Sequence, residues 1–138
     1  MLTPLTRQRR VLIVNGFTDG REMYVAYLRH NSLSVREATS PTTALPLVRR
    51  FQPDVIVTDF VFRTGSVDGP GFINAVRQMR DVINPTIIVV SGFTQIRDER
   101  RARDAGADAF LIKPCLAEQL LFEVQRALAV RSLDESTR

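Results

Sequence analysis

The chain of 138 residues carries 19 Lys and Arg against 15 Asp and Glu, which gives a net charge of +4 at neutral pH. This length suits one domain and leaves little room for a second. With 44% hydrophobic and 25% charged residues, the composition excludes a disordered or membrane-embedded chain. No apolar run approaches the roughly 20 residues that span a bilayer. The segment from Met1 to Arg10 is too polar and basic for a signal peptide.

Arginine supplies 18 of the cations, and Lys113 is the only lysine. Because the arginines are scattered among acidic residues, the basic balance indicates a solvated surface rather than a nucleic-acid footprint. The single cysteine, Cys115, excludes a disulfide framework and a cysteine-based zinc site. We therefore expect a cytoplasmic domain whose partners are neither membranes nor nucleic acids.

Short apolar runs recur along the chain and are continuous rather than alternating. Such runs predict strands buried on both faces, as in a parallel sheet covered by helices. A weaker, more polar run from Ser34 to Ala38 suits an edge strand. The four continuous runs are Val11–Val14, Val55–Val57, Ile87–Val90 and Phe110–Ile112.

Helical periodicity fills the intervals between these runs. Pro46 is expected to kink or shorten the second helix. Thr94 is expected to cap the fourth helix and Gly106 to end it. The predicted helices cover about Asp19–Asn31, Pro41–Phe51 with Ser40 as its cap, a segment around Phe72–Met79, Gln95–Ala105, and Leu116–Val130.

Strands and helices therefore alternate about five times, which predicts a doubly wound α/β fold. In such a sheet, chemistry gathers beyond the carboxyl ends of the strands. Asp59, Ser91 and Lys113 each follow or end an apolar run. A carboxylate, a hydroxyl and an ammonium at one sheet edge suit a phosphorylatable aspartate, because the ammonium and the hydroxyl can bind phosphoryl oxygens.

At these residues the sequence resembles the receiver domain of two-component response regulators. The segments VLIVNG, PDVIVTDF, IIVVSG and AGADAFLIKP carry the resemblance, in order, over about 10–130. The resemblance implies a flavodoxin-like, five-stranded parallel sheet in strand order 2-1-3-4-5. It also implies an N-terminal extension at 1–9, a receiver domain at 10–131 and a frayed C-terminal tail at 132–138.

The resemblance also implies roles for four residues. Asp59 matches the phosphoacceptor, and Lys113 matches the phosphate-contacting lysine that precedes a proline often in a cis bond. Ser91 matches the switch hydroxyl, which also contacts the phosphoryl group. Phe110 matches the switch aromatic residue.

Asn15 and Gly16 depart from the family pattern, which has two adjacent acidic residues at this point to hold Mg²⁺. Only Asp59 and the backbone carbonyl of Val61 remain as ligands that the resemblance implies. Because Mg²⁺ prefers carboxylate oxygens in near-octahedral geometry, we expect weak Mg²⁺ binding. Asp19 is a candidate replacement ligand, although capping of the first helix with Glu22 is the simpler interpretation.

The loop after Asp59 is a second departure, since it lacks the family's Met-Pro pair and carries Asp68-Gly69 about two residues late. Asp68 is a candidate replacement ligand, but a turn role before Gly69 is the simpler interpretation. Gly65, Gly69 and Gly71 are expected to give this loop conformational freedom.

The resemblance implies a signalling domain rather than an enzyme, with self-catalysed phosphoryl transfer to Asp59 at most. A histidine kinase or phosphotransfer protein would supply the phosphoryl group, and a downstream protein or output domain would respond. The surface of the fourth helix, fifth strand and fifth helix is expected to carry output or homodimer contacts. His30, beside Arg29 and Asn31, is expected to be an ordinary surface residue.

Two functions stay open from the sequence. One is a receiver whose phosphorylation is impaired or atypical, and the other is a degenerate receiver that binds a protein without phosphorylation. A flavodoxin-like cofactor-binding enzyme is disfavoured, because the segment GFTDG after the first strand matches neither a dinucleotide-binding fingerprint nor a P-loop. No organic cofactor is expected.

Overall fold

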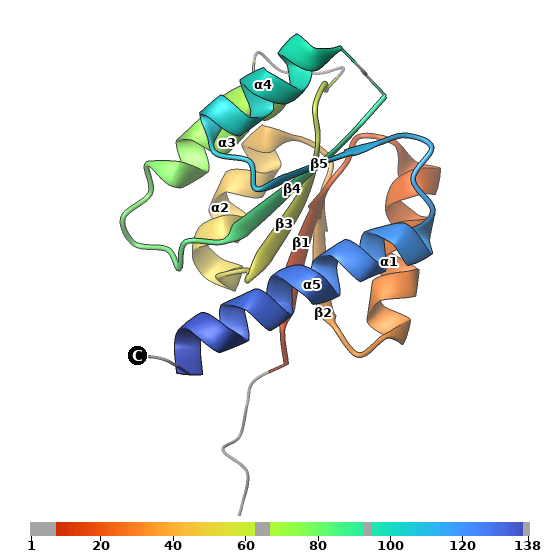
Figure 1. The fold of residues 1–138 in the computed structure, drawn as a ribbon, viewed down its shortest axis with the longest axis vertical. Helices are drawn as coiled ribbons and strands as arrows, with labels where there is room; N and C mark the ends of the chain where they lie inside the picture. The colour runs from red at the N-terminus through yellow and green to blue at the C-terminus, as the bar shows by residue number, and fades with distance from the viewer. Residues whose placement is uncertain (1–7, 63–66, 93–94, 137–138) are drawn as a thin grey trace, which may run out of the picture.

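The computed structural model describes residues 8–62, 67–92 and 95–136, within which strands and helices alternate along the chain (Figure 1). The strands are β1 (Arg10–Val14), β2 (Ser34–Ala38), β3 (Val55–Asp59), β4 (Thr86–Ser91) and β5 (Ala109–Ile112). The helices are α1 (Thr18–His30), α2 (Pro41–Phe51), α3 (Gly69–Arg77), α4 (Ile96–Ala105) and α5 (Ala117–Ser136). Every predicted strand and helix is therefore present, with boundaries that differ by a few residues.

The strands form one parallel sheet in the order β2-β1-β3-β4-β5, which confirms the doubly wound α/β prediction. The chain places β2 at an edge, as its polar sequence predicted. The register sets Asp59 beside Val90 and Ser91 beside Ile112. The carboxyl ends of β3, β4 and β5 therefore meet at one edge of the sheet.

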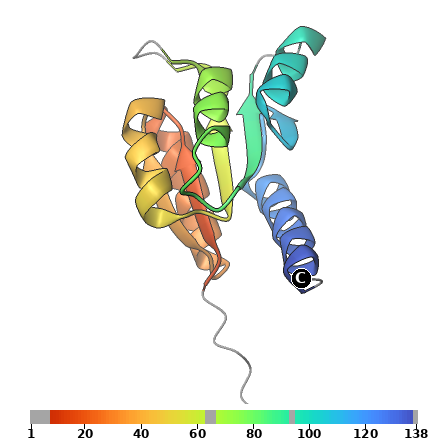
Figure 2. The same cartoon turned by 90° about the vertical axis from the view of Figure 1, so that its left-hand side faces the viewer.

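Helices cover both faces of the sheet. Because successive strand residues point to opposite faces, they pack into two separate hydrophobic cores. On one face, Ile13 and Val57 pack with α1 and α5. On the other face, Leu12 and Ile56 pack with α2, α3 and α4. Figure 1 shows α2 and α3 on one side of the sheet and α1 and α5 on the other, and Figure 2 looks at the molecule from the side that carries α2 and α3.

Helix α2 begins where the sequence predicted and is not shortened by Pro46. Ser40 adopts extended backbone geometry and forms a reciprocal capping box with Thr43, while Pro41 occupies the first helical position. The helix continues past Pro46 to Phe51, where Gln52 ends it in a left-handed conformation. The strong start and the buried face keep the helix intact despite one missing N–H donor.

Helix α3 starts with a close approach rather than with a flexible loop. Asp68 caps the helix by accepting a hydrogen bond from the Gly71 N–H at 2.8 Å, in line with its predicted turn role. The Gly69 N–H donates to the Phe60 carbonyl at 2.8 Å. A Cβ on Gly69 would lie 2.6 Å from that oxygen, so glycine is required here by contact with backbone. Gly65 lies outside the described residues.

The expected start of helix α1 is wrong in one detail. Phe17, rather than Asp19, is the N-cap residue, and it makes no side-chain cap hydrogen bond. Asp19 lies inside the first turn of the helix and is exposed. The expected Thr94 cap of α4 lies outside the described residues, and Gly106 ends α4 as predicted.

Helix α5 continues to Ser136, so the prediction of a frayed tail from Ser132 is wrong for most of that segment. The reason is a charge network at the amino edge of the sheet. Arg9 donates to Ser132 at 2.6 Å and pairs with Glu135 at 3.1 Å. It also lies 3.5 Å from Asp54, whose side chain is fully buried. Within the described ranges, no helix is long and apolar enough to cross a membrane.

Candidate functional site

The site begins with a buried ion pair at the carboxyl edge of the sheet. Asp59 is the last residue of β3 and is only 3% exposed, because every residue of β3 is buried. Lys113 follows β5, and its Nζ lies 2.9 Å from Asp59 Oδ1. The Lys113 side chain is one-third exposed, so the ammonium reaches the carboxylate from the solvent side.

Ser91 completes the predicted trio at the end of β4. The Lys113 N–H donates to the Ser91 carbonyl at 2.7 Å, which fixes the backbone around both residues. Ser91, Lys113 and Asp59 line one pocket of about 340 Å³. The three side chains that sequence reasoning placed at one sheet edge therefore lie together.

The pKa of Asp59 is raised above the ordinary aspartate value. Burial is the main cause, because a carboxylate loses hydration in this pocket. Lys113 and the nearby Gly16 N–H oppose the shift by stabilising the charged form. Asp59 Oδ2 is buried and makes no hydrogen bond of good geometry to the described residues. One carboxylate oxygen is thus paired and the other is not.

Phe17 is a site residue that sequence reasoning missed. Its ring lies 5.3 Å from Lys113 Nζ, within cation–π range, and it lines the pocket with Asp59. The side chain is 46% exposed, so it forms the outer wall of the pocket. The only sequence signal was an aromatic residue directly after Asn15-Gly16, and its contact with a residue 96 positions later is visible only in the fold.

Phe110 lies beside the site rather than in its lining. Its half-buried ring packs edge-to-face on Phe60, with centroids 6.2 Å apart and an interplanar angle of 77°. Phe60 directly follows Asp59, and the Arg101 guanidinium of α4 lies 5.6 Å from the Phe60 ring. A continuous contact path therefore joins the end of β3 to β5 and to α4.

The residues present do not fit a receiver-type magnesium site. Asn15 Oδ1 accepts a hydrogen bond from the Phe17 N–H at 2.7 Å, which engages the amide oxygen in a local turn. Gly16 has no side chain, and the Lys113 ammonium already contacts Asp59. Val61 lines the pocket and offers a backbone carbonyl at most. Asp59 is then the single carboxylate, where Mg²⁺ favours more oxygen ligands.

The two candidate replacement carboxylates do not complete a metal site. Asp68 is engaged by the Gly71 N–H and by Arg101 at 3.0 Å. Asp19 is an exposed residue of the first turn of α1. No group of three or more metal-ligating side chains is present among the described residues.

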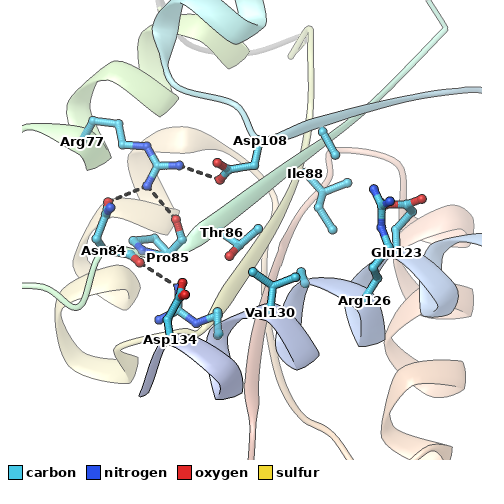
Figure 3. A pocket seen from close by; sticks show the side chains of 13 residues that line it. Arg77, Asn84, Pro85, Thr86, Ile88, Asp108, Glu123, Arg126, Val130 and Asp134 are labelled. Carbon is cyan, nitrogen blue, oxygen red and sulfur yellow. Dashed lines mark hydrogen bonds and ion pairs between the residues drawn. The ribbon is translucent and has the colours of Figure 1, made fainter. Parts of the chain in front are cut away.

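A separate pocket of about 380 Å³ lies at the opposite edge of the sheet, between α5 and the starts of β4 and β5 (Figure 3). Three acceptors hold the Arg77 guanidinium at one side of this pocket. Arg77 donates to Asn84, the Pro85 carbonyl and Asp108 within 2.9 Å. These contacts tie α3 to β4 and β5, and they give this pocket a structural role.

The family description "Response regulator receiver domain" matches residues 11–125. The chain belongs to the receiver domain family of two-component response regulators. The family match confirms the resemblance, and the sheet topology confirms the strand order that the resemblance implied. Within the family, receiver domains are signalling domains.

Curated relatives are similar to this receiver domain over most of its length. The chain is 31% identical to the response regulator MprA of Mycobacterium sp. (strain KMS), over 91% of this chain and 53% of that protein. It is 29% identical to the regulatory protein AtoC of Escherichia coli (strain K12), over 97% of this chain and 28% of that protein. The chain therefore spans about half, or less, of these relatives.

Solved structures share the fold. The chemotaxis response regulator CheY4 of Vibrio cholerae aligns with a TM-score of 0.79 and 26% identity, over 87% of this chain and 98% of that one. A CheY-like receiver domain protein from Methanospirillum hungatei JF-1 aligns with a TM-score of 0.83 and 20% identity, over 92% of this chain and 98% of that one.

Proposed function

We propose that Asp59 is the phosphoacceptor of this receiver domain, and that its phosphorylation alters a protein-interaction surface with impaired or atypical dependence on Mg²⁺. The observation that carries the proposal is the buried Asp59 carboxylate, 2.9 Å from the only lysine, in a pocket shared with Ser91. A histidine kinase or phosphotransfer protein is the proposed donor.

The chemistry is a displacement at phosphorus. An Asp59 carboxylate oxygen attacks the phosphorus of a phosphohistidine, the P–N bond breaks, and the electron pair leaves with the imidazole. Lys113 neutralises the phosphoryl oxygens, since its ammonium already lies at the carboxylate. The Ser91 hydroxyl lies in the same pocket as a second donor. No step is assigned to a metal, because the ligand set does not fit one.

The same pocket supports a readout. Phosphorylation adds a charge of about −2, which attracts the Lys113 ammonium and the Ser91 hydroxyl toward the new oxygens. Phe110 packs on Phe60, the residue after Asp59, so a shift at the site reaches β5. The Arg101 guanidinium of α4 also contacts the Phe60 ring, so the same shift reaches α4. The proposed output surface is therefore α4, β5 and α5.

That surface carries exposed apolar side chains suited to a protein partner or to a second copy of the chain. Ile112 and Phe122 are 49% and 63% exposed and line one pocket on the β5–α5 side. Leu116 lies between them in sequence and is 62% exposed. We propose that homodimer or output contacts use this face.

A second candidate function is a fixed interaction module that needs no phosphorylation. It is favoured by the Asp59–Lys113 pair, which is already closed and covered by the Phe17 ring. Without the acidic pair, Lys113 has no competing carboxylate at Gly16. In this alternative the site holds one state, and partner binding is independent of a phosphoryl donor.

Incubation with acetyl phosphate, with and without Mg²⁺, followed by intact mass spectrometry, tests the proposal. The expected result is an adduct of one phosphoryl group that is absent in Asp59→Asn. Asp81→Asn removes an exposed carboxylate and should leave the adduct unchanged. The yield should depend only weakly on Mg²⁺. No adduct from acetyl phosphate or from a histidine kinase would reject this function and support the fixed module.

A further inference from the structure

A cationic pocket lies at the amino edge of the sheet, away from Asp59. It has a volume of about 420 Å³. Arg10 and Ser34 begin β1 and β2, and Phe51 ends α2, so three elements meet around it. The pocket is lined by Arg10, Ser34, Arg36, Leu47, Arg50 and Phe51, with no acidic residue among them.

The Phe51 ring makes cation–π contacts with two of these arginines. The guanidinium carbons of Arg10 and Arg36 lie 5.7 Å and 5.6 Å from the ring centroid. Arg10 Nη1 also donates to the Phe51 carbonyl at 2.9 Å, which fixes its guanidinium. Cation–π contacts reduce the cost of bringing like charges together but do not neutralise them.

Two acidic residues, Glu37 and Asp81, pair with arginines that do not line the pocket. Glu37, next to Arg36, pairs with Arg21 at 2.9 Å. Asp81 pairs with Arg49 at 3.0 Å, next to Arg50.

Asp54 accepts from the Arg10 backbone N–H and lies near Arg9. In the part of the chain that the structure describes, neither Arg36 nor Arg50 contacts a carboxylate. The pocket in Figure 3 differs, because there Arg77 is bonded to Asp108.

Three guanidinium groups line this pocket, and neither Arg36 nor Arg50 pairs with a carboxylate among the described residues, which favours an anion from outside the chain. We propose that this pocket binds the phosphate group of a small phosphorylated molecule. A phosphate offers about two negative charges and several acceptor oxygens, which match planar guanidinium donors. The Ser34 hydroxyl supplies a further donor. A carboxylate carries one negative charge, and its two acceptor oxygens lie in one plane. It therefore matches three arginine side chains less well than a phosphate does.

Two-dimensional NMR of the full chain tests the proposal, following the backbone amides of Ser34, Arg36 and Phe51 and the arginine Nε–H signals. Inorganic phosphate, a sugar phosphate and a nucleoside monophosphate are titrated separately, with acetate as the singly charged control. Saturable shifts are expected at this pocket with each phosphate and not with acetate. The phosphate compound with the highest affinity indicates which chemical group the ligand carries on its phosphate.

Paired variants distinguish phosphate binding at this pocket from general attraction of anions to a positively charged chain. Arg36→Ala/Arg50→Ala should weaken phosphate binding at least about tenfold, because the variant removes two charged groups that donate hydrogen bonds to the phosphate. Arg97→Ala/Arg100→Ala removes the same charge from the exposed face of α4 and should change nothing. Arg36→Lys/Arg50→Lys keeps the charge without the forked donors and should weaken binding less.

Two results would overturn the proposal. Shifts that do not saturate indicate charge screening only. An equal loss in the two alanine pairs indicates attraction to net charge. Signals of Ser91 and Lys113 are followed in the same spectra, so that phosphate at the Asp59 pocket is recognised separately.

Discussion

Asp59 holds one paired and one unpaired carboxylate oxygen inside a buried pocket. A buried polar atom without a partner lowers the stability of the folded state. The arrangement is maintained because β3 pairs with β1 from Val55 to Thr58 and with β4 from Val55 to Asp59. Local instability of this kind is typical of a group kept for chemistry rather than for packing.

Asp59→Asn is therefore expected to raise the free energy of unfolding at pH 7 by about 1 kcal/mol. Because burial raises the pKa of Asp59, the folded protein holds the proton more tightly than the unfolded chain. Stability is lost as the pH rises from the ordinary aspartate range through the folded pKa. Urea denaturation at a series of pH values measures the difference between the two proteins.

The advantage of Asn over Asp should shrink as the pH falls into the range where the wild-type carboxyl is protonated in both states. Lys113 is one-third exposed, so losing its partner leaves the ammonium solvated. A variant that is less stable than wild type at pH 7 would show that the ion pair outweighs the desolvation.

Gly16→Asp is expected to raise Mg²⁺ affinity at least about tenfold, because it restores a carboxylate beside Asp59. A Cβ at this position would meet only the Thr39 carbonyl, at an ordinary 3.5 Å. The substitution should therefore fit without strain. Isothermal titration with MgCl₂ gives the affinities of the two proteins.

Ser32→Asp is the matched control for this substitution. Ser32 is exposed, lies at the amino edge of the sheet and has a φ of 67°, which Asp tolerates. It adds the same charge away from the site and should leave Mg²⁺ affinity unchanged. Tight Mg²⁺ binding by the unaltered chain would contradict the expectation of weak Mg²⁺ binding.

At the scale of elements, α5 is held at its end by charges rather than by an apolar stripe. Arg9 contacts the buried Asp54, and it binds Ser132 and Glu135 of the last turns. Arg131 approaches Asp54 at 3.9 Å from the helix itself. Arg9 before β1, Asp54 before β3 and the end of α5 therefore share one charge network.

Arg9→Ala is expected to lower the free energy of unfolding by roughly 2 kcal/mol, because it removes a partner of a buried carboxylate. Glu135→Gln removes only the exposed partner and should cost less than about 1 kcal/mol. Urea denaturation compares the two variants. Equal effects would mean that Asp54 does not depend on Arg9.

Most elements could be predicted because local pattern and burial agree. Continuous apolar runs identified β1, β3, β4 and β5, and Ser40-Pro41 identified the start of α2. The end of α5 could not be predicted, because the stripe fades after Leu128 and the contacts that extend it come from Arg9, 123 positions away from Ser132. Pro46 does not shorten α2, which continues to Phe51 although one backbone N–H donor is missing.

At the scale of the whole molecule, the site and the proposed output face are joined by side-chain contacts across three elements. Strand ends could be read from the sequence, so Asp59, Ser91 and Lys113 could be placed at one edge. Contacts made by loop residues could not be read in this way. Phe17 meets Lys113 only after β1 and β5 are brought into one sheet.

If the α4, β5 and α5 face mediates self-association, Phe122→Glu should weaken it at least about tenfold, because a charge replaces a 63% exposed apolar contact. Met23→Glu, on α1, introduces the same charge at a 49% exposed apolar residue and should have no effect. Sedimentation with and without phosphorylation measures the assembly. A chain that stays monomeric in every state would reject a homodimer at this face.

The Asp59–Lys113 pair has a practical consequence, because the chain has no other lysine. Apart from the amino terminus, an amine-directed reagent has one possible target, and that target lies against the carboxylate under an aromatic ring. The rate of acylation at this single nitrogen therefore reports how accessible the Lys113 amine is beside Asp59 and Phe17. One chemical label, read by mass, would monitor the site without any engineered probe.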